Sequence, residues 1–325
     1  MSEAVVSTRV RLARNLSDYP FPIRLSDDKA KEIADKVDEA LRDCGVRFHR
    51  IDLSTVSDTI RVALLERHLI SPDFVRGDKG RAVFLSDDNT VSIMVNEEDH
   101  IRLQVLRDGF EPDEAYEIAD RLDNALSRKL NYAFHEKLGY LTQCPTNLGT
   151  GMRASVMLHL PALDITGAVH RIGANLSKLG LTIRGLYGES TKPVGAFFQL
   201  SNQVTLGISE KAAIANLKNI TAQLIAQEMK AREQLLGKIE VRDKIARALG
   251  VLKTALVMDH GEAMSLLSLV RLGVASKQLS TLSTDSIDRL IVEIQPASVM
   301  TKFGEEMTPQ ERDIKRAEMI RERFA

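Results

Sequence analysis

One stretch decides the fold of this chain: Ser92-Ile93-Met94-Val95-Asn96-Glu97-Glu98-Asp99-His100-Ile101-Arg102, in which an apolar run meets three consecutive acidic residues. Short apolar runs bounded by turn residues are typical of buried strands. A second such run, residues 81–85, comes just before it, and Ser86-Asp87-Asp88-Asn89 has the composition of a hairpin turn. The pattern therefore predicts a β-hairpin that delivers Asn96–His100 at the end of a strand.

Periodic patterns on both sides of this hairpin predict a mixed fold. Residues 5–14 alternate as a strand does, which would place Arg9 and Arg11 on one face. Further strands are expected at 154–160, 182–186 and 196–200, and helices at 27–43, 111–138 and 164–179. Hairpin-like strands mixed with helices predict an α+β fold rich in antiparallel strands.

The periodicity of apolar residues changes after about residue 209, where strand-like patterns stop. A single helix is expected from 210 to about 249, with helical patterns continuing to the end. These patterns predict a first domain of residues 1–230 and a mostly helical second domain of residues 231–325.

Composition narrows the class of protein. The 325 residues include 44 basic and 45 acidic side chains, a net charge of −1, which argues against a nucleic-acid footprint spread over the surface. The two cysteines, Cys44 and Cys144, are too few for a disulfide framework. No leader or membrane-spanning run is evident, so we expect a cytoplasmic protein without membrane contacts.

Two segments carry residues that do not help a chain fold. The first is the acidic run Glu97-Glu98-Asp99, and the second is Cys144-Pro145-Thr146-Asn147-Leu148-Gly149-Thr150-Gly151-Met152-Arg153, which combines a thiol, a glycine-rich turn and an arginine. Three adjacent acids are usually a solvated loop, and a free cysteine is usually an inert small hydrophobe. Placed directly after a buried strand, however, a loop residue is held by a rigid scaffold, which favours an enzyme.

Five arginines form another candidate group: Arg9, Arg11, Arg102, Arg153 and Arg184. A single arginine is most often a surface residue in a weak ion pair. All five stand beside predicted strands or turns, so several guanidinium groups could converge on one polyphosphate through bidentate bonds. No P-loop motif is present, and an arginine cage would replace it. Next to Arg184, the loop Gly185-Leu186-Tyr187-Gly188-Glu189 could bring Glu189 opposite Glu98, although Gly-x-x-Gly is also a common turn.

These motifs resemble those of a known family. In order along the chain they are Ser7-Thr8-Arg9-Val10-Arg11, Asn96 to Arg102, Cys144 to Thr150, Arg153-Ala154-Ser155-Val156, Arg184-Gly185 and Ser201-Asn202, the order seen in phosphagen kinases such as creatine and arginine kinases. The resemblance covers roughly residues 1–230 and implies an antiparallel sheet flanked by helices.

Within that family the chain is more similar to the bacterial protein-arginine kinases. It starts almost directly at the Ser7–Arg11 strand, so we expect no helical N-terminal domain closing over a small guanidine, and hence an open site. It also carries Arg312-Asp313-Ile314-Lys315-Arg316-Ala317, which resembles the motif by which such kinases sense phosphoarginine.

The resemblance implies roles for particular residues. Glu98 would be the catalytic base, Glu189 a second carboxylate that orients the acceptor, and Cys144 a thiolate touching the same guanidinium. The five arginines would hold the triphosphate of ATP, with Mg²⁺ bridging the phosphate oxygens. Glu97 or Asp99 would act on this ion through water. The nucleotide-binding residues would be Ser7, Thr8, Arg9, Val10, Arg11, His68, Arg102, Arg153, Ala154, Ser155, Val156, Met157, Arg184, Gly185, Leu186, Tyr187 and Gly188. The allosteric phosphoarginine site would be formed by Arg312, Asp313, Arg316 and Ala317. Metabolic relatives place histidines near the adenine where this chain has Leu85 and Met157.

The activity implied is ATP-dependent phosphorylation of exposed arginines in proteins. By the same resemblance the chain would form a homodimer, respond to a zinc-binding activator, mark proteins for a Clp-type unfoldase and relieve a heat-shock repressor. Two alternatives stay open: a kinase for free arginine or another small guanidine, and a non-catalytic adaptor that binds phosphoarginine.

Overall fold

A computed structural model describes residues 2–77, 80–185, 194–280 and 282–325. It contains two compact units. We call Ser7–Val156 with Ser201–Lys218 the sheet unit, and Met1–Val6, Met157–Leu200 and Asn219–Ala325 the helical unit. This division differs from the sequence boundary near residue 230, which stays a prediction. Within the described ranges, no helix combines the length and apolar character that crossing a bilayer requires.

The strands confirm an α+β fold. They are β1 (Val5–Arg14), β2 (Phe48–Asp52), β3 (Ala82–Ser86), β4 (Val91–Val95), β5 (Ile101–Asp108), β6 (Phe134–His135), β7 (Gly139–Tyr140), β8 (Met152–His159), β9 (Leu181–Gly185) and β10 (Phe197–Asn202). In the described ranges eight of them follow the order β2-β3-β4-β5-β1-β8-β10-β9, and β6 pairs with β7. From β2 through β5 to β1 every pairing is antiparallel. The hairpin predicted from the acidic stretch is therefore confirmed as β3–β4.

Helices alternate with these strands and then dominate the C-terminal part. The α-helices are α1 (Asp27–Leu41), α2 (Asp58–Glu66), α3 (Pro72–Val75), α4 (Pro112–Ser127), α5 (Pro161–Ile165), α6 (Ala168–Leu176), α7 (Glu210–Leu236), α8 (Ile239–Thr254), α9 (His260–Ala275), α10 (Thr284–Glu293), α11 (Pro296–Phe303) and α12 (Pro309–Phe324). The 3₁₀ helices are η1 (Ser2–Ala4), η2 (Pro22–Arg24), η3 (Leu53–Thr55), η4 (Pro145–Asn147), η5 (Ser177–Leu179) and η6 (Val194–Ala196).

Three predicted helices were too long. The helix expected at 111–138 ends at Ser127, and the apolar residues beyond it lead into the β6–β7 ribbon. The helix expected at 164–179 is divided at Gly167, whose φ of 66° is not helical. The helix expected at 210–249 stops at Leu236, because Gly237 weakens it and Lys238 adopts an extended conformation as the N-cap of α8. Strands β2, β5, β6 and β7 were missed.

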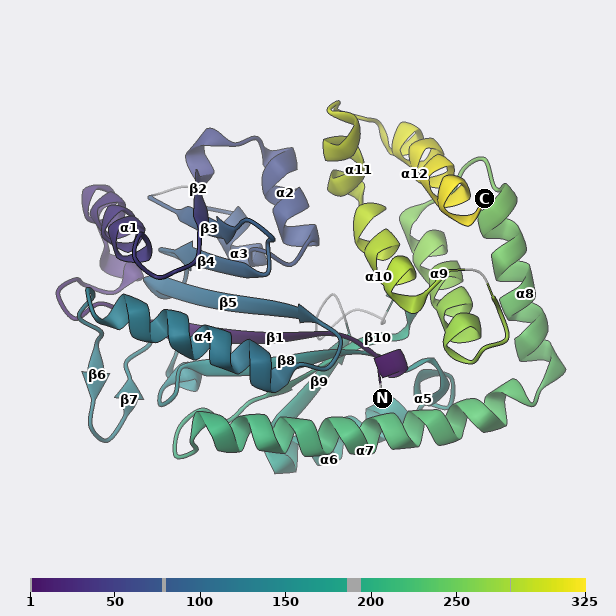
Figure 1. Ribbon diagram of the computed structural model, residues 1–325, viewed down its shortest axis with the longest axis horizontal. Coiled ribbons are helices and arrows are strands. Elements are labelled where there is room, and N and C mark those ends of the chain that lie inside the picture. The colour runs from purple at the N-terminus through teal and green to yellow at the C-terminus, as the bar shows by residue number, and fades with distance from the viewer. Residues whose placement is uncertain (1, 78–79, 186–193, 281) are drawn as a thin grey trace. The chain divides into compact units, whose positions relative to one another are not determined.

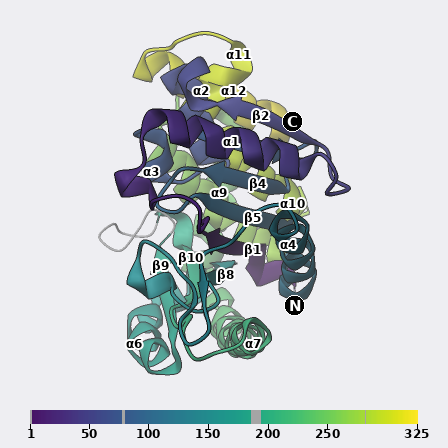
Figure 2. The same cartoon turned by 90° about the vertical axis from the view of Figure 1, so that its left-hand side faces the viewer.

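Two layers of helices enclose the sheet of the sheet unit. Helices α1 and α4 contact each other as well as β4 and β5, so they cover one face (Figures 1 and 2). The other face is packed by α2 and α3, whose Leu64 and Phe74 meet Val83 and Met94 in one apolar cluster. Successive side chains on a strand point to opposite faces, so β3 and β4 are apolar on both sides. Burial on both faces fixes the end of β4. The residues that follow it, 96–100, are called the acidic loop below.

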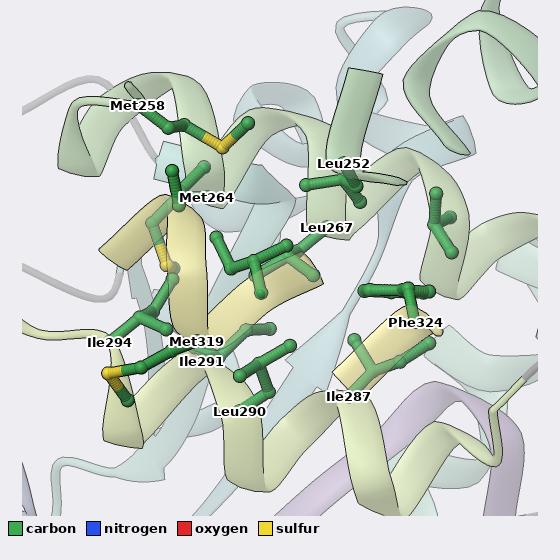
Figure 3. Close-up of a cluster of buried hydrophobic side chains, with 14 of the residues drawn as sticks. Leu252, Met258, Met264, Leu267, Ile287, Leu290, Ile291, Ile294, Met319 and Phe324 are labelled. Carbon is green, nitrogen blue, oxygen red and sulfur yellow. The ribbon is translucent and has the colours of Figure 1, made fainter. Parts of the chain in front are cut away.

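The helical unit has its own core. Side chains from α8, α9, α10 and α12 point toward one another in Figure 3, among them Leu252, Leu267, Leu290 and Phe324. Burying an aliphatic or aromatic side chain of this size contributes about 1.5–3 kcal/mol. The same unit buries Arg271, whose Nε and Nη2 donate to the two oxygens of Asp288 at 2.7 and 2.8 Å.

Candidate active site

The arginine cluster is built on one face of β1 and β5. Strand partners share a face, and Arg11 pairs with Gln104 while Ala13 pairs with Arg102. Arg9, two residues from Arg11, lies on this same face, as the alternating pattern predicted. Gln104 in turn donates from Nε2 to the carbonyl of His68 at 2.6 Å, which places the turn after α2 over these strands.

Electrostatics show that four of the arginines lie close together. Burial and, after it, the charges of Arg102 and Arg153 together lower the pKa of Arg9 to about 10. The pKa of Arg11 is also lowered by burial, then by Arg9, Arg102 and Arg153, while Glu97 opposes the shift. Positive groups that repel one another in a partly buried site are stabilised by a polyanion, which matches a triphosphate.

The acidic loop has a fixed backbone conformation. Asn96 has a φ of 62°, in the left-handed region that asparagine tolerates better than most residues. Its Nδ2 donates to the carbonyls of Ala30 and Gly80 at 2.8 and 2.7 Å, and its own carbonyl accepts from Arg81 Nε at 3.1 Å. The loop is thus anchored before the first glutamate.

The three acids after Asn96 have three different environments. Glu97 is buried and its Oε1 accepts from Arg102 Nη1 at 2.6 Å and from the Ser71 hydroxyl. Asp99 is buried and its Oδ1 accepts from Asn15 Nδ2 and from the backbone of Gln143. Glu98 is the one of the three whose side chain stays substantially exposed, at 36%, with Oε2 3.5 Å from Arg102 Nη2.

The segment from Cys144 to Gly151, called the cysteine loop below, is held close to Thr205. Thr205 Oγ1 donates to the carbonyls of Thr146 and Leu148 at 2.9 and 2.7 Å, and Cys144 Sγ lies 3.0 Å from Thr146 Oγ1. Gly149 has a φ of 101°, and a Cβ there would lie 2.3 Å from the carbonyl of Thr205. Only glycine allows this close approach, which explains the glycine-rich turn.

Both loops meet at one pocket in the sheet unit. It has a volume of about 180 Å³ and is lined by Arg11, Glu98, Arg102, Cys144, Thr146 and Arg153 among others. Pockets for whole small molecules usually measure about 300–1,000 Å³, so this one has room only for the reacting ends of larger molecules. Burial raises the pKa of Glu98, and the neighbouring charges of Asp99 and Glu97 add to the shift against the opposing Arg102. A raised pKa makes this carboxylate a better proton acceptor.

The remaining predicted nucleotide residues fall into distinct groups. Thr8, Val10, Ala154, Ser155 and Val156 are buried in β1 and β8, where they hold the strands that carry the arginines. Ser7, on β1, is half-buried.

His68 is within electrostatic reach of Arg9. Burial, followed by the charge of Arg9, lowers the pKa of His68 to about 4.

The structure assigns three further residues to the helical unit. Met157 packs against its apolar core, whereas Arg184 is exposed and Gly185 half-buried on β9. Leu186, Tyr187, Gly188 and Glu189 lie outside the described residues. Their predicted roles, and the opposition of Glu189 to Glu98, stay predictions.

The predicted phosphoarginine motif lies on α12. Arg316 is buried and donates to the carbonyls of Ile294 and Met258 at 2.8 and 3.0 Å, and it pairs with Asp313. Ala317 is buried as well, whereas Arg312 is half-buried and donates to the Met307 carbonyl at 3.2 Å. In this conformation Arg316 stabilises the helical unit, and phosphoarginine binding stays a prediction.

Sequence reasoning missed several side chains that support the site. Ser71 contacts Glu97, Asn15 contacts Asp99, and Thr205 holds the cysteine loop. Arg14 donates to Asp123 at 2.7–3.1 Å and to the Thr150 carbonyl at 3.0 Å, and it lies 3.5 Å from the ring centroid of Tyr140. Each is a single polar residue without a spacing pattern, so no local signal marks it.

Acidification should destabilise the protein through His100. This buried ring donates from Nε2 to the Pro20 carbonyl and accepts from the Leu16 backbone at Nδ1, and burial lowers its pKa to about 4. Between pH 6.5 and 4 the unfolded chain binds the extra proton, so stability present above pH 6.5 is lost as pH falls. At pH 5 the loss from this residue should be about 2 kcal/mol, measured by urea unfolding at pH 7 and 5. If His100→Gln loses as much unfolding free energy between pH 7 and 5 as the wild type does, the loss does not come from His100.

Comparisons with known proteins define the class. Residues 30–231 match the family model described as the ATP:guanido phosphotransferase C-terminal catalytic domain, and residues 238–325 match the protein-arginine kinase McsB C-terminal domain. Among solved structures, the duplicated taurocyamine kinase from Schistosoma mansoni is 28% identical with a TM-score of 0.66, covering 76% of this chain and 37% of that one. A lombricine kinase is 26% identical with a TM-score of 0.63, covering 70% of this chain and 67% of the other.

Several curated relatives match over nearly the full length. The protein-arginine kinase of Halothermothrix orenii is 46% identical over 99% of this chain and 93% of its own, and that of Clostridium acetobutylicum is 45% identical over 99% and 96%. The chain therefore belongs to the ATP:guanido phosphotransferase family, within its protein-arginine kinase branch. It is an enzyme that transfers a phosphoryl group to a guanidino acceptor.

Proposed function

We propose that this enzyme phosphorylates arginine side chains of proteins, with ATP as the donor. The observation that carries the proposal is the pocket itself: Glu98 and Cys144 line the same small cavity as Arg11, Arg102 and Arg153. The negative group suits a guanidinium, and the positive groups suit the phosphates. The names of the full-length relatives support a protein as the acceptor.

Glu98 would act as the general base. The guanidinium of arginine has a pKa near 13.8, so a neutral nitrogen at pH 7 costs about 9 kcal/mol, roughly seven units at 1.36 kcal/mol each. A carboxylate that accepts the proton while the P–N bond forms and the bond from the γ-phosphorus to the departing ADP breaks removes the need for a neutral nitrogen beforehand. The exposure of Glu98 to the pocket and its raised pKa both support this role.

The arginine cluster would bind the triphosphate and stabilise the transferring group. Phosphoryl transfer depends mainly on alignment and charge neutralisation. Glu97, clamped between Ser71 and Arg102, would orient the Arg102 guanidinium. Cys144 would contact the acceptor beside Glu98, and Glu189 would be the second carboxylate.

Mg²⁺ would enter with the nucleotide and neutralise phosphate charge, because this ion is commonly bound through substrate phosphates and waters. Among the described residues no group of three histidines, cysteines or acids is placed to hold a metal ion. The ion would then contact the protein through phosphates and waters, without a direct bond from a described side chain.

The wider biology is also a proposal. A cytoplasmic homodimer would respond to a zinc-binding activator, mark proteins for a Clp-type unfoldase and relieve a heat-shock repressor, with Arg312, Asp313 and Arg316 sensing phosphoarginine. The match of residues 238–325 to the protein-arginine kinase McsB C-terminal domain supports placing the chain among the kinases for which the resemblance implies this biology.

The test of the proposed function compares acceptors. Incubation with ATP should place acid-labile phosphate on arginines of an arginine-rich protein, detected by mass spectrometry, with little phosphorylation of free arginine. Phosphorylation of free arginine alone would show a small-guanidine kinase. Binding of phosphoarginine without turnover of either acceptor would show an adaptor.

A further inference from the structure

Two buried polar side chains lie between the acidic loop and the cysteine loop. Asn15 follows β1 and Asp99 lies in the acidic loop, and each is only 1% exposed. Neither lines the pocket that Glu98 and Cys144 share. Their effect on that pocket must therefore pass through the residues they contact.

Four hydrogen bonds connect the loops through this pair. Asp99 Oδ1 accepts from Asn15 Nδ2 at 2.6 Å and from the backbone N–H of Gln143 at 2.8 Å. Asn15 Nδ2 also donates to the Leu141 carbonyl at 3.0 Å, and Asn15 Oδ1 accepts from the backbone N–H of His100 at 2.9 Å. Residues 99–100 are thus joined to residues 141–143.

The joined residues stand directly beside the reacting groups. Glu98 precedes Asp99, and Cys144 follows Gln143. We propose that Asn15 and Asp99 are positioning residues that fix Glu98 and Cys144 relative to each other, so that both contact one acceptor guanidinium. This inference rests on the proposed roles of Glu98 and Cys144. We call the pair the Asn15–Asp99 clasp.

The cost of burying Asp99 supports a role beyond folding. Its Oδ2 is buried and has no hydrogen-bond partner among the described residues. An incompletely satisfied buried carboxylate destabilises a fold, and its presence calls for an explanation. Fixing two loops at a shared pocket provides one, because a reacting group displaced by about 1 Å can lose about 100-fold in rate.

The first test separates positioning from stability. Asp99→Ala and Asn15→Ala should each lower kcat for an arginine-containing peptide about 100-fold, while the Kd for ATP stays near the wild-type value. The matched control is Ser86→Ala, which removes a buried hydroxyl that donates to Asp88 and accepts from Val91 in the β3–β4 turn. Ser86→Ala should lower the melting temperature without this loss of kcat. A kcat loss in the control equal to that in the clasp variants would overturn the proposal.

A double-variant cycle tests whether the pair acts as a unit. The Asn15→Ala/Asp99→Ala enzyme should be no slower than either single variant, because removing one partner already releases the loops. Independent effects that multiply to about 10⁴-fold would overturn the proposal. Asp99→Asn, which keeps the volume and one acceptor oxygen, should fold and recover most of the lost kcat; activity as low as in Asp99→Ala would also overturn it.

A failed clasp can be distinguished from a failed active-site assignment. If Glu98→Gln is inactive but both clasp variants turn over normally, the clasp is wrong and the proposed function stands. If Glu98→Gln retains normal turnover, the assigned base itself is wrong.

Discussion

Replacement of Glu98 by Gln should reduce kcat for arginine phosphorylation by about 1,000-fold, within the range of about 10²–10⁴ that a positioned general base contributes. The substitution keeps the size and hydrogen-bonding shape of the side chain and removes its ability to accept the guanidinium proton. Because burial and the nearby acids raise the pKa of Glu98, the wild-type carboxylate is a stronger base than an exposed glutamate.

ATP binding separates this effect from a general loss of structure. Glu98 lies 3.5 Å from Arg102, a weaker contact than the 2.6 Å bond between Arg102 and Glu97, so the arginine cluster should stay oriented in the variant. The Kd for ATP, measured by calorimetry, should therefore stay near the wild-type value. Steady-state turnover close to wild type would show that another group takes the proton.

Asp123→Ala should lower the free energy of unfolding by about 3–5 kcal/mol, because it removes the carboxylate hydrogen-bonded to the buried Arg14 and leaves only the longer 3.8 Å contact with the carboxylate of Glu210. Burial alone would lower the pKa of Arg14, but the charge and hydrogen bonds of Asp123 more than offset this and raise it. Arg14 has its side chain 1% exposed, whereas exposed arginines readily exchange a lost partner for water.

Urea unfolding measures this loss, and a surface pair provides the control. Lys218 and Asp113 form an ion pair at 2.5 Å in the same unit, but both side chains are exposed. Asp113→Ala should therefore cost no more than about 1 kcal/mol. A similar loss of unfolding free energy in the two variants would mean that burial does not determine how much the Arg14–Asp123 pair stabilises the fold.

The sequence predicted the parts of the site that follow local rules. Alternation along β1 placed Arg9 and Arg11 on one face, and the apolar run before Asn96 placed the acidic loop at the end of β4. The α+β class followed from these same strands. The patterns missed strand β5, which directly follows the acidic motif. They also extended the helix that begins near residue 111 beyond its end at Ser127.

The different roles of the three acidic residues could be distinguished only from the structure. By sequence pattern alone Glu97, Glu98 and Asp99 are three adjacent acids, and the resemblance left open which of Glu97 and Asp99 would act on a metal ion through water. Their roles depend on residues 26 and 84 positions away, Ser71 and Asn15. Hydrogen bonds over such separations are set by the folded chain and have no local signature.

The mutual repulsion of Arg9, Arg11, Arg102 and Arg153 has a consequence for the resting enzyme. Keeping these like charges close together disfavours the folded chain, and the proposed binding of nucleotide phosphates would relieve the repulsion. Nucleotide supply would then govern how long the protein survives in the cell as well as how fast it works, because occupancy shifts the folding equilibrium by mass action.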